Sequence, residues 1–160
     1  MKNFILLLLT TIIFNNIYGQ GPFTATQTGD WNDGATWGNT SPGVVGTDFP
    51  GTGDNATVPE DLVTIIVTVP IGVTANCNNL TIGNGFFFGG ISQLFVGEAG
   101  GGATLNIGGN LSFFCGAGAA YQLISRHTSS IINVSGNIIF DASGTSDRMN
   151  LVSGGTVNID

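Results

Sequence analysis

The amino-acid sequence predicts an all-β protein, a right-handed parallel β-helix (β-solenoid) with an N-terminal capping segment. Three observations predict this fold class. A nine-residue phrase recurs, its starts 25, 27 and 25 residues apart. Each copy alternates apolar and polar residues, as a half-buried strand does. No helical periodicity appears after residue 20. A period of this length without helices is typical of stacked β coils, each of which contacts only its neighbours.

The repeated phrase consists of a strand, a tight corner and a second strand. Its copies read LTIGNGFFF from Leu80, LNIGGNLSF from Leu105, INVSGNIIF from Ile132 and VNID from Val157. Gly, Asn and Ser at the fourth to sixth positions favour a turn. The seventh and ninth residues are again apolar. We therefore predict that the copies stack in register and that the second residues form an outward polar ladder, which comprises Asn106, Asn133 and Asn158. An antiparallel sandwich or barrel has similar strands but no reason to repeat a phrase in register.

Residues 1–19 are interpreted as a signal peptide. A basic Lys2 precedes the apolar run FILLLLTTIIF, which is too short to span a bilayer as a helix, and we predict cleavage after Gly19. A retained N-terminal anchor is the alternative. The remaining chain would carry two arginines and ten acidic residues, a net charge of −8. An extracellular or cell-surface location follows.

Residues 20–57 differ in composition from the rest and are predicted to cap the first coil. They contain Trp31 and Trp37, whose bulk suits the cover of a hydrophobic solenoid end. An exposed tryptophan pair for stacking on a sugar is the alternative. Residues 58–160 would form the coils. Because VNID opens a coil at the chain end, we expect the β-helix to be truncated there.

Charge and cysteine content restrict the function classes. Only three residues are basic, so the chain lacks the basic face that a nucleic-acid partner requires. Cys77 and Cys115 have no metal-ligand spacing. They are 38 residues apart, about one and a half periods, so we predict that they lie on different sides of a coil and are not bonded to each other.

The sequence offers no catalytic constellation. Glycoside hydrolysis requires convergent carboxylates, and no two acidic residues share a position on adjacent coils of the predicted register. His127 stands alone and is interpreted as a solvated loop residue. Asp30, Asp33 and Asp54 could contribute to a calcium site, but turn-forming aspartates are the simpler interpretation. We therefore predict no catalytic residue, no cofactor and no metal.

Phe87 and Ile139 are predicted to contact a partner at the surface. In the register above, Phe87 occupies the outward position held by Ser112 and Ile139 in the next coils. Phe86 and Phe88 would then point into the core. The outward pair is interpreted either as a strip covered by a return loop or as a binding strip for a sugar face or a protein.

Several segments resemble a known family. TGDWNDGATWG, PGTGDNATVP and VTVPIGVTANCNNLTIGNG resemble the eight-glycine extracellular domain and its bacterial surface-protein relatives, over roughly residues 26–113. The link GNTSPGVVGTDFPGTGD is longer than in that pattern. The resemblance implies a β-helical surface module. Many such relatives are adhesin-like and are exported by type IX secretion through a C-terminal sorting domain, which these 160 residues do not contain. It transfers no catalytic residue.

We expect a secreted or cell-surface structural or adhesive module that presents a surface to extracellular polysaccharide or to a surface protein. The first alternative is the N-terminal part of a polysaccharide-acting β-helix enzyme whose active site lies beyond residue 160. The second alternative is a structural stalk without a ligand.

Overall fold

The computed structural model describes residues 22–59, 61–83, 91–114, 120–140, 148–151 and 154–160. These residues form fourteen strands and one short 3-10 helix, η1 (Gly34–Trp37). The strands are β1 (Phe23–Thr24), β2 (Gly29–Asp30), β3 (Ala56–Val58), β4 (Ile65–Val69), β5 (Thr74–Cys77), β6 (Leu80–Ile82), β7 (Ile91–Val96), β8 (Thr104–Ile107), β9 (Leu111–Phe113), β10 (Ala120–Ser125), β11 (Ile131–Val134), β12 (Ile138–Phe140), β13 (Arg148–Leu151) and β14 (Thr156–Ile159). The prediction of an all-β chain is confirmed for the described residues.

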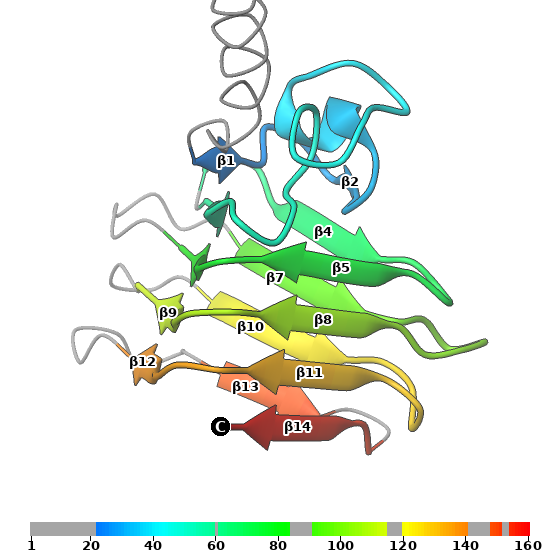
Figure 1. Ribbon diagram of the computed structural model, residues 1–160, viewed down its shortest axis with the longest axis vertical. Coiled ribbons are helices and arrows are strands. Elements are labelled where there is room, and N and C mark those ends of the chain that lie inside the picture. The colour runs from blue at the N-terminus through cyan, green and yellow to red at the C-terminus, as the bar shows by residue number, and fades with distance from the viewer. Residues whose placement is uncertain (1–21, 60, 84–90, 115–119, 141–147, 152–153) are drawn as a thin grey trace, which may run out of the picture.

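The strands form three sheets, and every strand pairing between named strands is parallel. Sheet 1 has the order β1-β3-β6-β9-β12, sheet 2 has β13-β10-β7-β4-β2 and sheet 3 has β14-β11-β8-β5. From β4 onward, the chain visits sheet 2, sheet 3 and sheet 1 in that order and then begins again. We call each such round a pass. Figure 1 shows β5, β8, β11 and β14 lying one beside the next along the stack.

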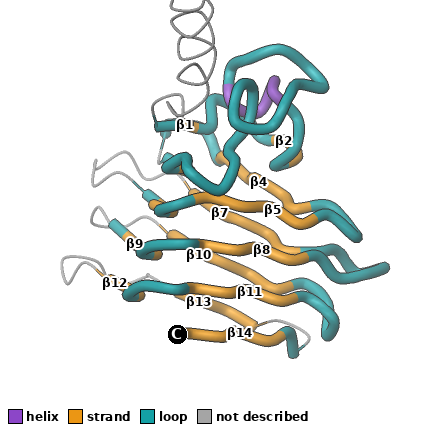
Figure 2. The backbone as a smooth tube through the Cα atoms, in the orientation of Figure 1, coloured by secondary structure: helices purple, strands orange, loops and turns teal. Residues whose placement is uncertain are grey.

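Alternation along each strand builds a common core between the sheets. In sheet 3, the residues that point inward from β8 are Leu105 and Ile107, which are almost fully buried, whereas Thr104 and Asn106 between them are half-buried. The same alternation holds in β4, β6 and β9. Because side chains of neighbouring parallel strands lie side by side, inward residues of successive passes stack on one another. The backbone tube in Figure 2 shows the strands separated by loops at the corners.

The structure corrects the predicted register of the first copy of the phrase. Leu80 pairs with Leu111, and Ala75, not Leu80, pairs with Leu105. The segment that begins at Leu80 therefore corresponds to the second strand of the later copies, in sheet 1. Passes along sheet 3 are 30, 27 and 25 residues long, as the pairs Ala75–Leu105, Leu105–Ile132 and Ile132–Val157 show. The later copies do stack as predicted.

Asparagines at the corner between sheets 3 and 1 hold successive passes together. The Asn79 backbone N–H donates to Asn55 Oδ1 at 3.2 Å. The Asn110 N–H donates to Asn79 Oδ1 at 2.8 Å, and the Asn137 N–H donates to Asn110 Oδ1 at 2.9 Å. Each of these asparagines directly precedes a strand of sheet 1. We call this row the corner ladder. It satisfies backbone donors that the turn would otherwise leave unpaired.

Glycine accompanies the corner ladder where passes approach closely. A Cβ atom at Gly136 would lie 2.7 Å from Asn110 Oδ1 and 2.7 Å from the Gly109 carbonyl oxygen. No real Cβ contact is that short, so a side chain at this position would separate the corners. The dipeptide Gly-Asn at residues 109–110 and 136–137 is therefore explained by the corner and by the ladder together.

The N-terminal segment is joined to the sheets. β1 pairs with β3 in sheet 1, and β2 pairs with β4 in sheet 2. The predicted boundary at residue 57 falls inside β3. Beyond β2, the η1 turn is capped by Asp33, whose carboxylate accepts from the Ala35 N–H at 2.9 Å. Figure 1 places this segment at one end of the stack and the chain's C-terminus at the other.

Inward-pointing side chains are more exposed on β12 and β14 than on the strands before them. Phe140 stacks on Phe113, with ring centroids 4.9 Å apart, yet it is 50% exposed while Phe113 is fully buried. Ile159 pairs with Val134 and is 60% exposed. Each of these side chains has a described neighbour on only one side of its stack. Of the two stacked phenylalanines, Phe113 therefore belongs to the core, whereas Phe140 is only partly covered.

Candidate functional site

The outer side of sheet 3 carries a regular array of polar side chains. Residues that point outward from β5, β8, β11 and β14 form two rows. The first row contains Thr74, Thr104, Ile131 and Thr156, and the second contains Asn76, Asn106, Asn133 and Asn158. We call these eight residues the Thr/Asn face. It follows from strand alternation, because the residues between them point into the core.

The asparagine row is linked by hydrogen bonds between side-chain amides. Asn106 Nδ2 donates to Asn76 Oδ1 at 2.9 Å, Asn133 Nδ2 to Asn106 Oδ1 at 2.7 Å and Asn158 Nδ2 to Asn133 Oδ1 at 2.7 Å. The predicted outward ladder of Asn106, Asn133 and Asn158 is confirmed. Asn76 also belongs to it, and sequence reasoning missed Asn76 because it assigned Thr81 to that position.

The ladder leaves hydrogen-bonding capacity on its outer side. Among the described residues, each interior amide uses one N–H and one oxygen lone pair in the ladder, whereas a neutral amide has two of each. Each pass therefore presents one further donor and one further acceptor. The ladder also fixes the side-chain torsions, so a ligand would not have to order these groups.

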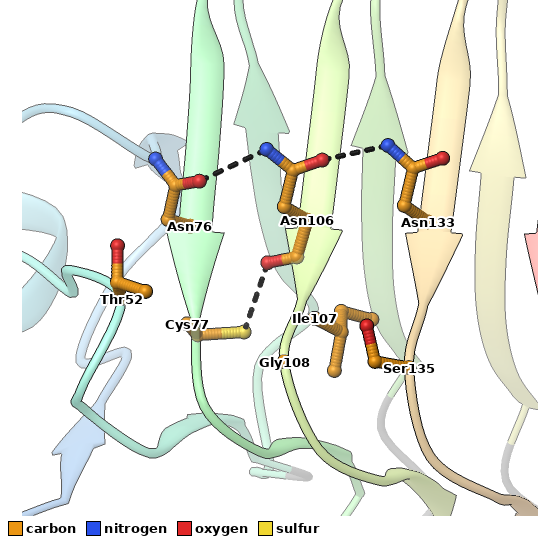
Figure 3. Close-up of a pocket in the computed structure, with 8 residues that line it drawn as sticks. All are labelled: Thr52, Asn76, Cys77, Asn106, Ile107, Gly108, Asn133 and Ser135. Atoms are coloured by element: carbon orange, nitrogen blue, oxygen red, sulfur yellow. Dashed lines mark hydrogen bonds between the residues drawn. The ribbon is translucent and has the colours of Figure 1, made fainter. Parts of the chain in front are cut away.

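A groove with a volume of about 200 Å³ runs along the ladder. It is lined by Thr52, Asn76, Cys77, Asn106, Ile107, Gly108, Asn133 and Ser135. Because Asn76, Asn106 and Asn133 are equivalent residues of three passes, the groove crosses the passes. Figure 3 shows their amides in one row, and the Ser135 backbone N–H donates to the Ile107 carbonyl oxygen at 2.9 Å.

The groove is electrically neutral. Of the eight residues that line it, none is charged. The Cys77 thiol is buried and directed toward the Asn106 carbonyl oxygen, 4.0 Å away (Figure 3). Burial raises the pKa of Cys77 to about 12, so its thiol stays protonated at neutral pH and is a poor nucleophile. The site can form hydrogen bonds with neutral polar groups.

Cys77 forms no disulfide with another described residue, and it lies on sheet 3 beside Ile107. Cys115 lies outside the described residues. The predicted absence of a bond between the two stays a prediction.

The register predicted for Phe87 is wrong, whereas the predicted contact of Phe87 and Ile139 with a partner stays a prediction. Thr81, not Phe87, pairs with Ser112, which in turn pairs with Ile139. The error follows from the misplaced first copy. Phe86, Phe87 and Phe88 lie outside the described residues. Ile139 is 41% exposed, and its described outward neighbour in sheet 1 is Ser112.

Two of the three aspartates considered as calcium ligands form hydrogen bonds with backbone N–H groups of their own loops. Asp33 caps η1, and Asp54 accepts from the Gly51 N–H at 2.9 Å. Asp30 is exposed on β2. Within the described ranges, no three His, Cys, Asp or Glu residues lie close enough together to hold a metal ion. The second oxygen of Asp54 is buried without a hydrogen-bond partner.

His127 also belongs to a loop. Its Nδ1 accepts from the Ser129 backbone N–H at 3.1 Å and lies 2.7 Å from Ser129 Oγ. These contacts of the ring with Ser129 stabilise the turn in which both residues lie.

The tryptophans cannot form an exposed stacking platform. Trp31 is 1% and Trp37 is 4% exposed, and their rings meet edge to face with centroids 5.1 Å apart. Trp37 Nε1 donates to the Trp31 carbonyl oxygen at 2.8 Å. Phe23 packs against Trp37 as well. The aromatic residues therefore form the core of the N-terminal segment.

A second pocket, of about 240 Å³, is lined by Thr26, Gln27, Thr28, Asp61, Val63, Thr64 and Ile65. Its residues come from the loop after β1 and from the approach to β4, so it does not cross successive passes. Thr28 is part of the fold here, because its hydroxyl accepts from the Ile66 N–H at 3.0 Å.

No helix in the part of the chain that the structure describes is long and apolar enough to cross a membrane. Neither a protein-family model, nor a curated protein, nor a solved structure matches the chain.

Proposed function

We propose that this chain is an exported adhesive module, built as a right-handed parallel β-helix, that presents the Thr/Asn face to neutral extracellular carbohydrate. Support for the β-helix comes from the cyclic order in which the chain visits its three parallel sheets. Support for export comes from the apolar N-terminal run after Lys2 and from the resemblance to bacterial surface modules of the eight-glycine type. Type IX secretion is the export route that this resemblance suggests.

The proposal of a carbohydrate ligand rests on the row of asparagine amides on the Thr/Asn face and on the uncharged groove beside it. The asparagines of the Thr/Asn face form a pre-ordered, hydrogen-bonded row of amides, and none of the residues that line the groove beside it is charged. Sugar hydroxyls both donate and accept hydrogen bonds, so they match amides that keep one donor and one acceptor each. A protein partner would instead favour a large apolar centre with aromatic anchors, and the outward positions of sheet 3 contain only Ile131 as an apolar residue.

The experiment is a binding assay of the exported protein on immobilised polysaccharides. Neutral polymers of glucose, mannose and xylose are compared with anionic polymers of uronic acids. We expect binding to a neutral polymer that changes little between low and high ionic strength, because no ion pair is involved. Binding only to anionic polymers, or loss of binding in salt, would contradict the proposal. Mass spectrometry of the exported chain tests the predicted cleavage of the signal peptide after Gly19, which would leave Gln20 as the first residue.

A further inference from the structure

We propose that an extended neutral polysaccharide chain lies in the groove parallel to the stack, with about one sugar residue per pass. This inference rests on the proposed function and adds the orientation, the register and the chemical class of the ligand. The polysaccharide crosses sheet 3 from β5 toward β11, over Asn76, Asn106 and Asn133 (Figure 3).

The direction follows from the shape of the groove. Its lining repeats from pass to pass along the stack, whereas along any one strand it extends over only a few residues. A linear polymer placed across the strands meets the same amide in every pass. A polymer placed along one strand would leave the equivalent amides of the other passes without contact.

The register follows from the strand spacing. Neighbouring strands of a sheet are about 4.8 Å apart. This spacing is close to the length of one residue in an extended β-1,4-linked hexose chain, so successive sugars can meet successive amides without accumulating a large mismatch over three passes. Each amide offers one donor and one acceptor to the hydroxyls of one sugar.

The chemical class follows from charge and from the absence of rings. None of the eight residues that line the groove is charged or aromatic. A uronic acid would lose its hydration without gaining a cation, so neutral hexoses are favoured. Without a stacking ring, affinity must come from repeated hydrogen bonds, and it therefore depends on the number of sugars in contact.

The first test is a length series. Calorimetric titration of the exported protein with β-1,4-linked glucose oligomers, and separately with mannose oligomers, runs from the dimer to the hexamer. Each added sugar that gains a net hydrogen bond should tighten binding roughly 3- to 10-fold. The gain should stop at the trimer or tetramer, when the three passes of the groove are filled. Affinity independent of length would overturn the inference.

The second test blocks the groove at Gly108. A Cβ atom there would meet only the Cys77 carbonyl oxygen at 3.7 Å, an ordinary contact, so Gly108→Leu should fold while its side chain enters the groove lining. Gly100→Leu is the matched control, because a Cβ at Gly100 meets only Ile71 Cδ1 at 3.5 Å and Gly100 is not in the lining. We expect at least a tenfold loss of affinity for Gly108→Leu and none for Gly100→Leu.

A third variant covers the case in which Gly108→Leu does not fold. Asn106→Leu removes the central amide with little change of volume and should lower the affinity and flatten the length series, whereas Thr81→Ala on sheet 1 should change neither. Unchanged binding in Asn106→Leu would overturn the inference. If the protein binds neutral polymers but fails these tests, only the placement is wrong. If it binds no neutral polymer, or binds a protein instead, the proposed function fails as well.

Discussion

Two isoleucines on sheet 3 allow a controlled test of core stacking. Ile132 and Ile159 both point inward from this sheet, and both would be changed to alanine. Ile132 is fully buried between Leu105 and Val157, while Ile159 rests on Val134 and is 60% exposed. The two substitutions remove the same atoms, and they compare a central strand, β11, with the edge strand of the described sheet, β14.

The burial of each side chain sets the expected magnitude. A fully buried Ile→Ala change costs about 2–5 kcal/mol, because it removes apolar contact and leaves a cavity. Complete burial of such a side chain contributes about 1.5–3 kcal/mol, and Ile159 is covered over only two fifths of its surface, so its loss should cost about 0.6–1.2 kcal/mol. Ile132→Ala should therefore be roughly three to four times as destabilising as Ile159→Ala.

The assay is urea unfolding of the exported protein, followed by tryptophan fluorescence and by far-ultraviolet circular dichroism. Trp31 and Trp37 are buried in the N-terminal segment, so fluorescence reports unfolding at the end of the stack away from Ile159. Dichroism reports the strands as a whole. Coincident transitions by the two probes permit one free energy of unfolding for each variant.

Equal costs for the two variants would refute the reasoning. Such a result would mean that Ile159 is as well covered in solution as Ile132. A cost below about 1 kcal/mol for Ile132→Ala would refute it differently, because a fully buried isoleucine cannot be lost so cheaply from a packed core.

Three further predictions concern single contacts. Asn110→Ala should lower the free energy of unfolding by about 0.5–1.5 kcal/mol because the Asn137 N–H loses its acceptor, whereas Asn110→Asp retains the oxygen and should be close to wild type in urea unfolding. Because the pKa of Cys77 is raised from 9.0 to about 12, its contribution to stability is fully present below pH 9.0 and is progressively lost toward about pH 12. Cys77→Ala should therefore flatten the dependence of the free energy of unfolding on pH in that window. An unchanged pH dependence would show that the thiol is not buried in solution. Trp37→Phe should cost about 1–3 kcal/mol more than the loss of ring volume alone, because the Trp31 carbonyl loses its hydrogen-bond donor. Trp31→Phe is the comparison, because it removes an indole N–H that has no partner among the described residues. Thermal unfolding compares the two variants, and equal costs would argue against the hydrogen bond.

The asparagine ladder could largely be predicted from the sequence because it depends on local pattern. Apolar residues on either side of Asn106 and Asn133 direct both amides outward, and the similar spacing of the later copies places them side by side. Each of these inferences needs only the two-residue period of a strand. The core positions Leu105, Ile107 and Ile132 follow from the same alternation.

The register of the first copy could not be predicted, because the two strands that flank a corner look alike. Leu80–Ile82 has the same apolar-polar-apolar pattern as both β8 and β9, and the sequence provides no reason to prefer either. Backbone pairing between passes decides the matter and places Leu80 beside Leu111. The longer first pass of 30 residues concealed this choice.

The sequence by itself determined the strand pattern, the corners and the lack of charge. Only the tertiary structure decided which residues surround the groove, since Thr52 and Ser135 are far apart in the chain. The corner ladder, too, is visible in the sequence only as scattered asparagines that precede the strands of sheet 1. Its hydrogen bonds form only when the passes stack, because each side-chain oxygen then accepts from a backbone N–H of the next pass. The physical reason is range: alternation is fixed between adjacent residues, whereas register is fixed by hydrogen bonds between residues about one pass apart.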